Sequence, residues 1–189
     1  MIDVTNVEKV ILGLSTNSFD PEKNFAAALE YDRLNQTSSA AFFFLRAAEW
    51  GYKTHPLVAY ASLLKMAQCY GKQVNRENTV ASSLLHAVTF LPQRPEGHFL
   101  LARYYERNKK WQEAYTQASI GIMMAINSYN DPLPTYVEYE GLYCLLFEKA
   151  VAGWWLGQKD ESKKIFEDLL KQDIAQEYRT AIENNLKLY

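Results

Sequence analysis

The chain has 189 residues, of which 48% are hydrophobic and 22% are charged, and its formal net charge is −2 at pH 7. This length and apolar content are enough to bury a sizeable core, so we expect a soluble single domain. Because the charge is nearly neutral, bulk electrostatics favours neither nucleic acid nor an anionic membrane as a partner. No apolar run reaches the roughly 18 residues of a membrane span, and the N-terminus has no signal segment, so we expect a cytoplasmic protein.

Helices are predicted along almost the whole chain. Residues 1–18 have an apolar spacing that is compatible with a short helix or with a linker. Asp20, Pro21 and Glu22 form the pattern of an N-cap, a first-turn proline and an acidic first turn, and Pro95 opens a later helix in the same way. The predicted helices cover residues 21–34, 37–50, 56–71, 76–91, 95–108, 111–125, 139–156, 159–171 and 174–187.

The longest irregular stretch runs from Asn127 to Glu138 and contains Pro132 and Pro134. It interrupts the regular succession of helices, and insertions of this kind in repeat scaffolds often carry function. The alternative is a plain structural connector. The sequence alone leaves both possibilities open.

A pattern of aromatic and small residues recurs along these helices. Tyr31 is followed nine residues later by Ala40, and Tyr105 is followed nine residues later by Ala114. Small or apolar residues then continue at helical intervals: Phe44 and Ala47 in the first copy, Ala118 and Gly121 in the other. The aromatic residue fills the gap between hairpins, whereas the small residues let two antiparallel helices approach closely. A period near 34 residues is typical of stacked helix–turn–helix units.

This pattern resembles the tetratricopeptide repeat (TPR) over about residues 20–171. The Trp and Gly that are common in the first helix of that family are absent; Asn24 and His98 stand at the Trp place, and Ala28 and Ala102 at the Gly place. The resemblance implies an all-α, right-handed superhelical solenoid of antiparallel helix hairpins. We expect about four repeats plus a C-terminal capping helix, in one domain over residues 19–189, with an N-terminal segment or linker at 1–18 and an insertion at 127–138.

A narrower resemblance rests on the run from Arg94 to Glu106 and on parts of the sequence between Asp131 and Gly157. These segments are similar to the TPR-like modules that accompany family 2 glycosyltransferases in bacteria and their viruses. Nothing in the chain resembles the catalytic domain of those enzymes. The resemblance therefore implies a non-catalytic part of a glycan-assembly system, with a glycosyltransferase domain as a partner.

The residues do not form a recognisable catalytic or metal-binding pattern. His55, His86 and His98 are not spaced with carboxylates or cysteines as a zinc site requires. Gly71 and Lys72 lack the upstream glycine and the following hydroxyl residue of a phosphate-binding loop. We therefore predict a protein that is not an enzyme and that uses no cofactor or metal. The two cysteines fall within predicted helices, and we expect them to be buried thiols.

In repeat solenoids the first helix of each hairpin lines the concave face, where ligands bind. The TPR resemblance assigns groove positions to the following residues: Phe25, Leu29 and Asp32 from the first unit; Leu64 and Gln68 from the second; Phe99, Arg103 and Glu106 from the third; and Phe147, Val151 and Trp154 from the fourth. The alternative for the three phenylalanines is that they belong to the core between helices. Arg103 is the strongest candidate, because a long cation rarely faces a core unpaired and can bind a carboxylate.

Three hypotheses for function follow. The leading one is a non-catalytic scaffold that binds a protein or peptide partner in its concave groove. The second is an accessory module that positions a glycosyltransferase or its acceptor. Trp154 and Trp155 lie about 100° apart on a helix, so we expect one indole to be partly exposed, where either a sugar or a peptide could stack. The third is a structural subunit that self-associates, and we expect a monomer or a weak homodimer.

Overall fold

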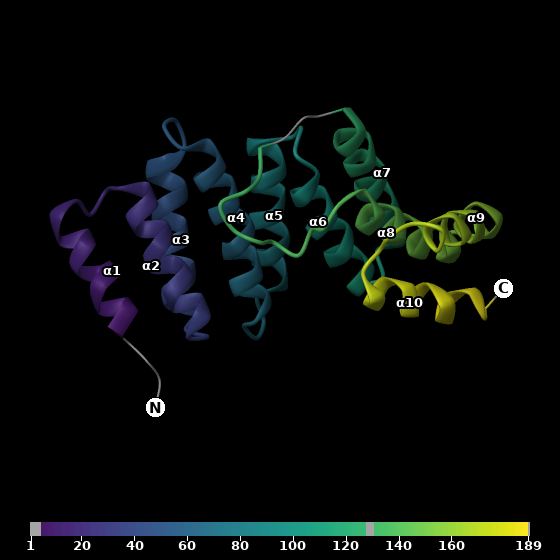
Figure 1. The fold of residues 1–189 in the computed structure, drawn as a ribbon, viewed down its shortest axis with the longest axis horizontal. Helices are drawn as coiled ribbons and strands as arrows, with labels where there is room; N and C mark the ends of the chain where they lie inside the picture. Colours follow the sequence, from purple (N-terminus) through teal and green to yellow (C-terminus); the bar gives the residue numbers. More distant parts are fainter. Residues whose placement is uncertain (1–4, 128–130, 189) are drawn as a thin grey trace. The chain divides into compact units, whose positions relative to one another are not determined.

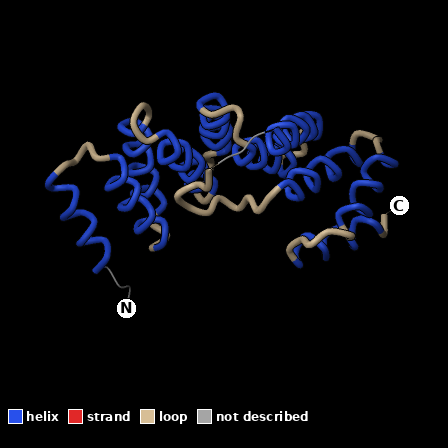
Figure 2. The backbone as a smooth tube through the Cα atoms, turned by 45° about the horizontal axis from the view of Figure 1, so that its top comes forward, coloured by secondary structure: helices blue, strands red, loops and turns tan. Residues whose placement is uncertain are grey.

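The structure is a computed structural model that describes residues 5–127 and 131–188, and all of the regular elements in these ranges are α-helices (Figure 1). Residues 1–4 of the predicted N-terminal segment and residues 128–130 of the predicted insertion lie outside the described ranges. Figure 2 shows the helices joined by loops. The chain divides into two compact units: the first is Met1–Leu91 with Asp131–Val137, and the second is Pro92–Asn130 with Glu138–Tyr189.

The first unit contains five helices in its described part, and successive helices pack against each other. Their bounds are α1 (Thr5–Thr16), α2 (Pro21–Arg33), α3 (Thr37–Gly51), α4 (Pro56–Gly71) and α5 (Glu77–Phe90). Helices α2 and α3 form one hairpin and α4 and α5 the next, and α4 also contacts both α2 and α3. The residues predicted as a short helix or linker form α1, which packs on α2.

The beginning of α2 follows the predicted capping pattern. The side chain of Asp20 accepts hydrogen bonds from the backbone N–H groups of Glu22 and Lys23, both at 3.0 Å. Pro21 occupies the first helical turn, where a missing N–H costs nothing. Pro95 likewise stands in the first turn of its helix. Both sequence predictions of a helix start are therefore confirmed.

The second unit also contains five helices in its described part. They are α6 (Pro95–Arg107), α7 (Trp111–Asn127), α8 (Leu142–Trp155), α9 (Lys159–Leu169) and α10 (Gln176–Leu186). Helices α6 and α7 form a hairpin, α8 and α9 form the next, and α8 contacts both α6 and α7. Helix α10 covers α8 and α9, with Ile174 and Ile182 buried in a cluster that includes Phe166 and Leu169. The predicted C-terminal helix over 174–187 is present as α10, two residues shorter at its start.

The turns within three hairpins share one backbone conformation. Asn35, Lys109 and Gly157 all have a positive φ, of 57°, 57° and 83°. After each of them the next N–H donates to the carbonyl oxygen five residues earlier, for example from Lys110 to Tyr105 at 2.9 Å. This is the hydrogen bond of a Schellman motif, which ends a helix and lets the chain reverse. The repeated turn explains why the aromatic and alanine positions keep the same spacing.

Close approach of the helices depends on the small residues of the pattern. Ala40 and Ala114 are fully buried between the helices of their hairpins. A Cβ atom added to Gly121 would lie 2.6 Å from Leu145 Cδ2 and 2.9 Å from His98 Cβ, so α7 touches both α6 and α8 at this point. The packing role predicted for these positions is confirmed.

The largest difference from a predicted boundary lies at the start of α8. The helix expected from residue 139 begins at Leu142, because Gly141 directly before it has a φ of 141°, which no helical turn accommodates. Only glycine adopts this conformation without strain. The described residues of the connection between α7 and α8, 131–141, are called the α7–α8 loop below.

Candidate functional site

The structure places three of the predicted groove residues in the core. The side chains of Phe25, Leu64 and Phe99 are 6%, 0% and 0% exposed. Phe25 packs edge-to-face on Phe44, with ring centroids 5.8 Å apart. Their burial agrees with the core alternative for the two phenylalanines, and part of the cover of Phe99 comes from the ring of Tyr139. Leu29 is half-buried.

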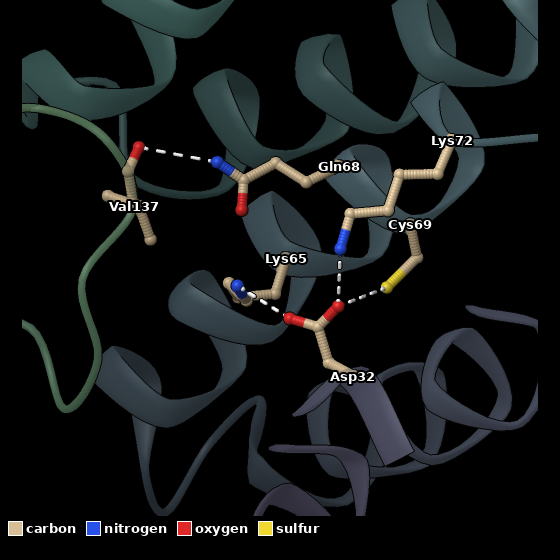
Figure 3. Close-up of polar contacts among 6 residues, drawn as sticks. All are labelled: Asp32, Lys65, Gln68, Cys69, Lys72 and Val137. Atoms are coloured by element: carbon tan, nitrogen blue, oxygen red, sulfur yellow. Dashed lines mark hydrogen bonds and ion pairs between the residues drawn. The ribbon is translucent and has the colours of Figure 1, made fainter. Parts of the chain in front are cut away.

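Asp32 lies at the centre of a charged cluster between α2 and α4, which we call the Asp32 cluster: Asp32, Lys65, Cys69 and Lys72 (Figure 3). Its carboxylate is 2.8 Å from Lys65 Nζ and 2.7 Å from Lys72 Nζ. Burial by itself raises the pKa of Asp32, but hydrogen bonds and attraction from the two lysines outweigh it and leave the pKa below its usual value. The cluster therefore carries one excess positive charge.

Cys69 is buried within this cluster, 3.9 Å from an Asp32 oxygen. Burial and the nearby Asp32 carboxylate raise its pKa to about 11, so the thiolate is scarce at neutral pH. Cys144, the other cysteine, is also a buried free thiol whose pKa burial raises. The prediction of buried thiols is confirmed.

The α7–α8 loop packs on α4 within the first unit. Gln68, a predicted groove residue, donates a hydrogen bond from Nε2 to the carbonyl oxygen of Val137 at 3.4 Å (Figure 3). The Val137 side chain is only 3% exposed. Part of the insertion therefore lies against a first helix, at a position that the TPR resemblance assigns to a ligand.

In the second unit, the next residues of the same loop lie on α6. We call this group the Arg103 cluster: Phe99, Arg103, Glu138, Tyr139 and Glu148. The guanidinium of Arg103 lies 2.8 Å from Glu138 Oε2 and 3.8 Å from Glu148 Oε1. It also lies over the ring of Phe99, 5.3 Å from the centroid.

The aromatic residue beside Glu138 completes the contact. The Tyr139 ring centroid is 5.5 Å from that of Phe99, and Tyr139 is half-buried. Burial raises the pKa of Tyr139 well above its usual value, so the phenol is neutral at any physiological pH. The α7–α8 loop thus presents a carboxylate and a neutral aromatic ring to one face of α6.

Glu148 of α8 is the buried member of the Arg103 cluster, with 5% of its surface exposed. Burial raises its pKa to about 8, against the opposing attraction of Arg103; Glu106 raises it further and Arg107 lowers it. Glu106, a predicted groove residue, thus acts on this site through its charge. At neutral pH Glu148 is mostly protonated, so Glu138 is the main anionic partner of Arg103.

The predicted groove residues of α8 lie on another face of that helix. Phe147 packs on Phe166 and on Tyr178 of α10, with ring centroids 5.8 Å and 5.1 Å away. Val151 packs against the same cluster. Trp154 is half-buried, with Lys159 Nζ 5.1 Å from its ring centroid. These side chains therefore serve the packing of α8 with its C-terminal neighbours.

The two adjacent tryptophans differ in exposure, as their spacing predicts. Trp155 is 57% exposed and stacks on Trp111 of α7, with ring centroids 5.0 Å apart and planes within 9°. One face of the Trp155 indole is thereby covered, and the residue remains one of the most exposed aromatic side chains in the described part of the chain.

Sequence reasoning missed Glu138 and Glu148 as members of the site. Glu148 had a signal: it is the one acidic residue of α8, a helix in which the residues from Leu142 to Phe147 are all uncharged. A carboxylate in such a segment needs a cationic partner. Glu138 had no such signal. Its partner Arg103 is 35 positions away in the sequence, so no local pattern joins the two residues.

Metal-binding and membrane-spanning features are absent from residues 5–127 and 131–188. These residues contain no group of three or more His, Cys, Asp or Glu side chains that could hold a metal ion. No helix among them is both long enough and apolar enough to cross a membrane. His98, which stands at the Trp place of the repeat, is buried and packs with its ring nitrogens near Gln117 Oε1 and the Pro92 carbonyl.

No known protein-family model matches the chain. No curated protein is similar to it at a significant level. Solved structures do match: MamA has a TM-score of 0.65 at 10% identity, covering 97% of this chain and 90% of that one. YrrB, a TPR protein with an unusual peptide-binding site, has a TM-score of 0.64 at 11% identity over 96% and 85% of the two chains.

A third similar structure is TTC0263, a thermophilic TPR protein of Thermus thermophilus, with a TM-score of 0.61 at 15% identity over 95% and 88% of the two chains. Identities this low show the fold alone. The chain therefore has the all-α, TPR-like helical-repeat fold that its spacing predicts.

Proposed function

We propose that this protein is a non-catalytic, cytoplasmic interaction module that binds an extended peptide segment of a partner protein on the first helices of its hairpins. The observation that carries the proposal is Arg103. It is 26% exposed on a first helix, it is oriented by the ring of Phe99, and it already holds a carboxylate at 2.8 Å. A charge-assisted hydrogen bond to a partner's carboxylate is the interaction for which such an arginine is suited.

The fold supports this proposal without specifying it. TPR-like arrays present successive first helices, and one structurally similar protein, YrrB, is described as having an unusual peptide-binding site. The Arg103 cluster and the loop contact at Gln68 both lie on first helices, α6 and α4. They are two separate surfaces, one in each unit.

The test is peptide selection followed by affinity measurement. Peptides from a random display library are selected on the full chain, and their dissociation constants are measured by fluorescence anisotropy for the wild type, Arg103→Ala and Arg107→Ala. We expect Arg103→Ala to weaken binding at least about tenfold, a loss of about 1.4 kcal/mol. Arg107→Ala removes the same charge one turn away on α6 and should leave the affinity nearly unchanged. Equal affinity of the wild type and Arg103→Ala, with both folded, would contradict the proposal.

A second candidate function is the accessory module of a glycan-assembly system. The observation that favours it is Trp155, which offers an indole stacked on Trp111 for contact with the apolar face of a sugar. Saturation-transfer NMR with a panel of mono- and disaccharides tests it. Binding that is lost in Trp155→Ala and kept in Trp50→Ala, a control at another exposed indole, would support this function; no saturation transfer with any saccharide would remove it.

A further inference from the structure

We propose that Glu138 and Tyr139 are an internal ligand of α6, and that the partner which replaces them presents the same two groups, a carboxylate next to an aromatic ring. This inference rests on the proposed function and adds to it the chemistry of the partner and a competitor within the chain. The site is the Arg103 cluster of the second unit.

The loop pair is bound as a ligand would be bound. Glu138 comes from a loop and meets the guanidinium of a helical arginine at 2.8 Å, while Tyr139 lies against the same helix through Phe99 at 5.5 Å. Arg103 and Phe99 are themselves one turn apart on α6 and contact each other. Two consecutive loop residues therefore engage two neighbouring positions on one helix face.

The backbone at Glu138 has a φ of 68°. A residue with a side chain adopts this left-handed conformation at a cost, and the cost is tolerated where local contacts fix the geometry. Here the contacts of Glu138 and Tyr139 with α6 help to hold the residue in this conformation. A partner that takes over these contacts also relieves the unfavourable conformation, which assists displacement.

Displacement of the pair leaves the surface intact. The Glu138 side chain is 51% exposed, so its removal uncovers little surface, and removal of Tyr139 uncovers the ring of Phe99, which a partner's aromatic ring then covers. Arg103 keeps a second carboxyl group within reach, because Glu148 lies 3.8 Å away in α8. Phe99 is held by its burial in the packing of α6. The receptor surface is thus formed by helical residues that do not depend on the loop.

The chemistry of the displaced pair identifies the partner class. Arg103 requires an anionic carboxylate, since Glu148 is largely uncharged at neutral pH. The ring of Phe99, next to it, accommodates a flat apolar group in tilted contact, as it does Tyr139. We therefore assign to this face an extended peptide with an Asp or Glu directly followed by Tyr, Phe or Trp.

The experiment uses the full chain and a peptide of residues 134–141, with both ends blocked, as the probe. An open variant carries Glu138→Gln and Tyr139→Ala. A matched control carries Glu140→Gln and Tyr136→Ala, the same substitutions at neighbouring loop positions outside the Arg103 cluster. Circular dichroism melting checks that each protein is folded, and NMR titration detects binding up to millimolar concentrations.

We expect the open variant to bind the peptide at least about tenfold more tightly than the wild type and the matched control do. In those two proteins only the molecules whose own Glu138 and Tyr139 have left α6 can bind the peptide. Adding Arg103→Ala to the open variant should abolish binding, as should Glu→Gln at the first position of the pair in the peptide. Equal binding to wild type and open variant, or no binding to a folded open variant, would overturn the internal-ligand proposal.

The failures of the two proposals are distinguishable. If library-selected peptides need Arg103 but bind the wild type and the open variant equally, the internal ligand is refuted and the interaction function stands. If the loop peptide binds the open variant through Arg103 while selected peptides ignore Arg103, the internal ligand stands and the proposed binding surface for partners is refuted.

Discussion

The guanidinium of Arg103 lies 3.8 Å from Glu148, a carboxyl group that is 5% exposed and mostly protonated at neutral pH. Arg103 is therefore shared between an exposed, ionised partner in a loop and a buried partner whose charge depends on pH. This arrangement links the stability of the second unit to proton binding at one position.

The first prediction is that stability falls between about pH 4.5 and about pH 8 through Glu148. Its pKa is raised to about 8 in the folded state, so unfolding releases a proton in this window and the free energy of unfolding decreases as pH rises. We expect a loss on the order of 2–4 kcal/mol across the window. Urea denaturation as a function of pH measures it. In Glu148→Gln this pH-dependent loss of stability should vanish. Parallel pH profiles of the wild type and the variant would refute the prediction.

A second prediction concerns Arg103→Ala. The arginine lowers the pKa of Glu148, so its removal should move that pKa still higher and extend the fall in stability to higher pH. Below the pKa of Glu148 the variant should lose only the pair with the exposed Glu138, at most about 1 kcal/mol, and the contact with the Phe99 ring, about 0.5–1 kcal/mol. Thermal melting at acidic and at alkaline pH checks this. A loss of stability that is equal at both pH values would contradict the prediction.

Gly121→Ala should destabilise the second unit. The added methyl group would meet Leu145 Cδ2 at 2.6 Å and His98 Cβ at 2.9 Å, which forces the helices apart and costs about 1–3 kcal/mol. Gly13→Ala is the matched control. Nothing lies within 4 Å of the added atom there, and alanine favours the helix by up to about 1 kcal/mol. Chemical denaturation should give opposite signs for the two substitutions.

Lys109→Gly should stabilise the hairpin of α6 and α7. Lys109 has a φ of 57°, and glycine adopts this conformation without the steric cost that a side chain brings, a gain of roughly 0.5–1 kcal/mol. Lys109→Ala retains the Cβ atom and should leave the unfolding free energy, measured by urea denaturation, nearly unchanged. If both substitutions change stability equally, the effect comes from the lost lysine side chain.

The helices were predictable from sequence because their signals are local. Asp20 with Pro21, Pro95 and the Tyr105-to-Ala114 spacing each specify a boundary or a packing face over a few residues. The helix expected from residue 139 began late because Tyr139 makes a tertiary contact instead, which propensity cannot anticipate. The fold could thus be predicted from the sequence, whereas the helix boundary next to the α7–α8 loop could not.

The candidate site was predictable only in part. Arg103 was identified because an arginine on a first helix needs a partner, but the partner comes from a loop whose path depends on tertiary structure. In α8 the family positions pointed to Phe147, whereas its neighbour Glu148 faces Arg103. A difference of one residue rotates the side-chain direction on a helix by about 100°, so the two neighbours face different parts of the structure.

The first unit is built from two separate stretches of sequence. Asp131–Val137 belongs to it, although α6 and α7 come between α5 and these residues in the order of the chain. A fragment that stops at Leu91 would contain all five described helices of the unit and still lack the residue that accepts the hydrogen bond of Gln68. During synthesis this unit is completed only after the next hairpin has been made. Fragments of the protein should therefore be chosen so that they keep the contacts of each unit, and not by position along the chain alone.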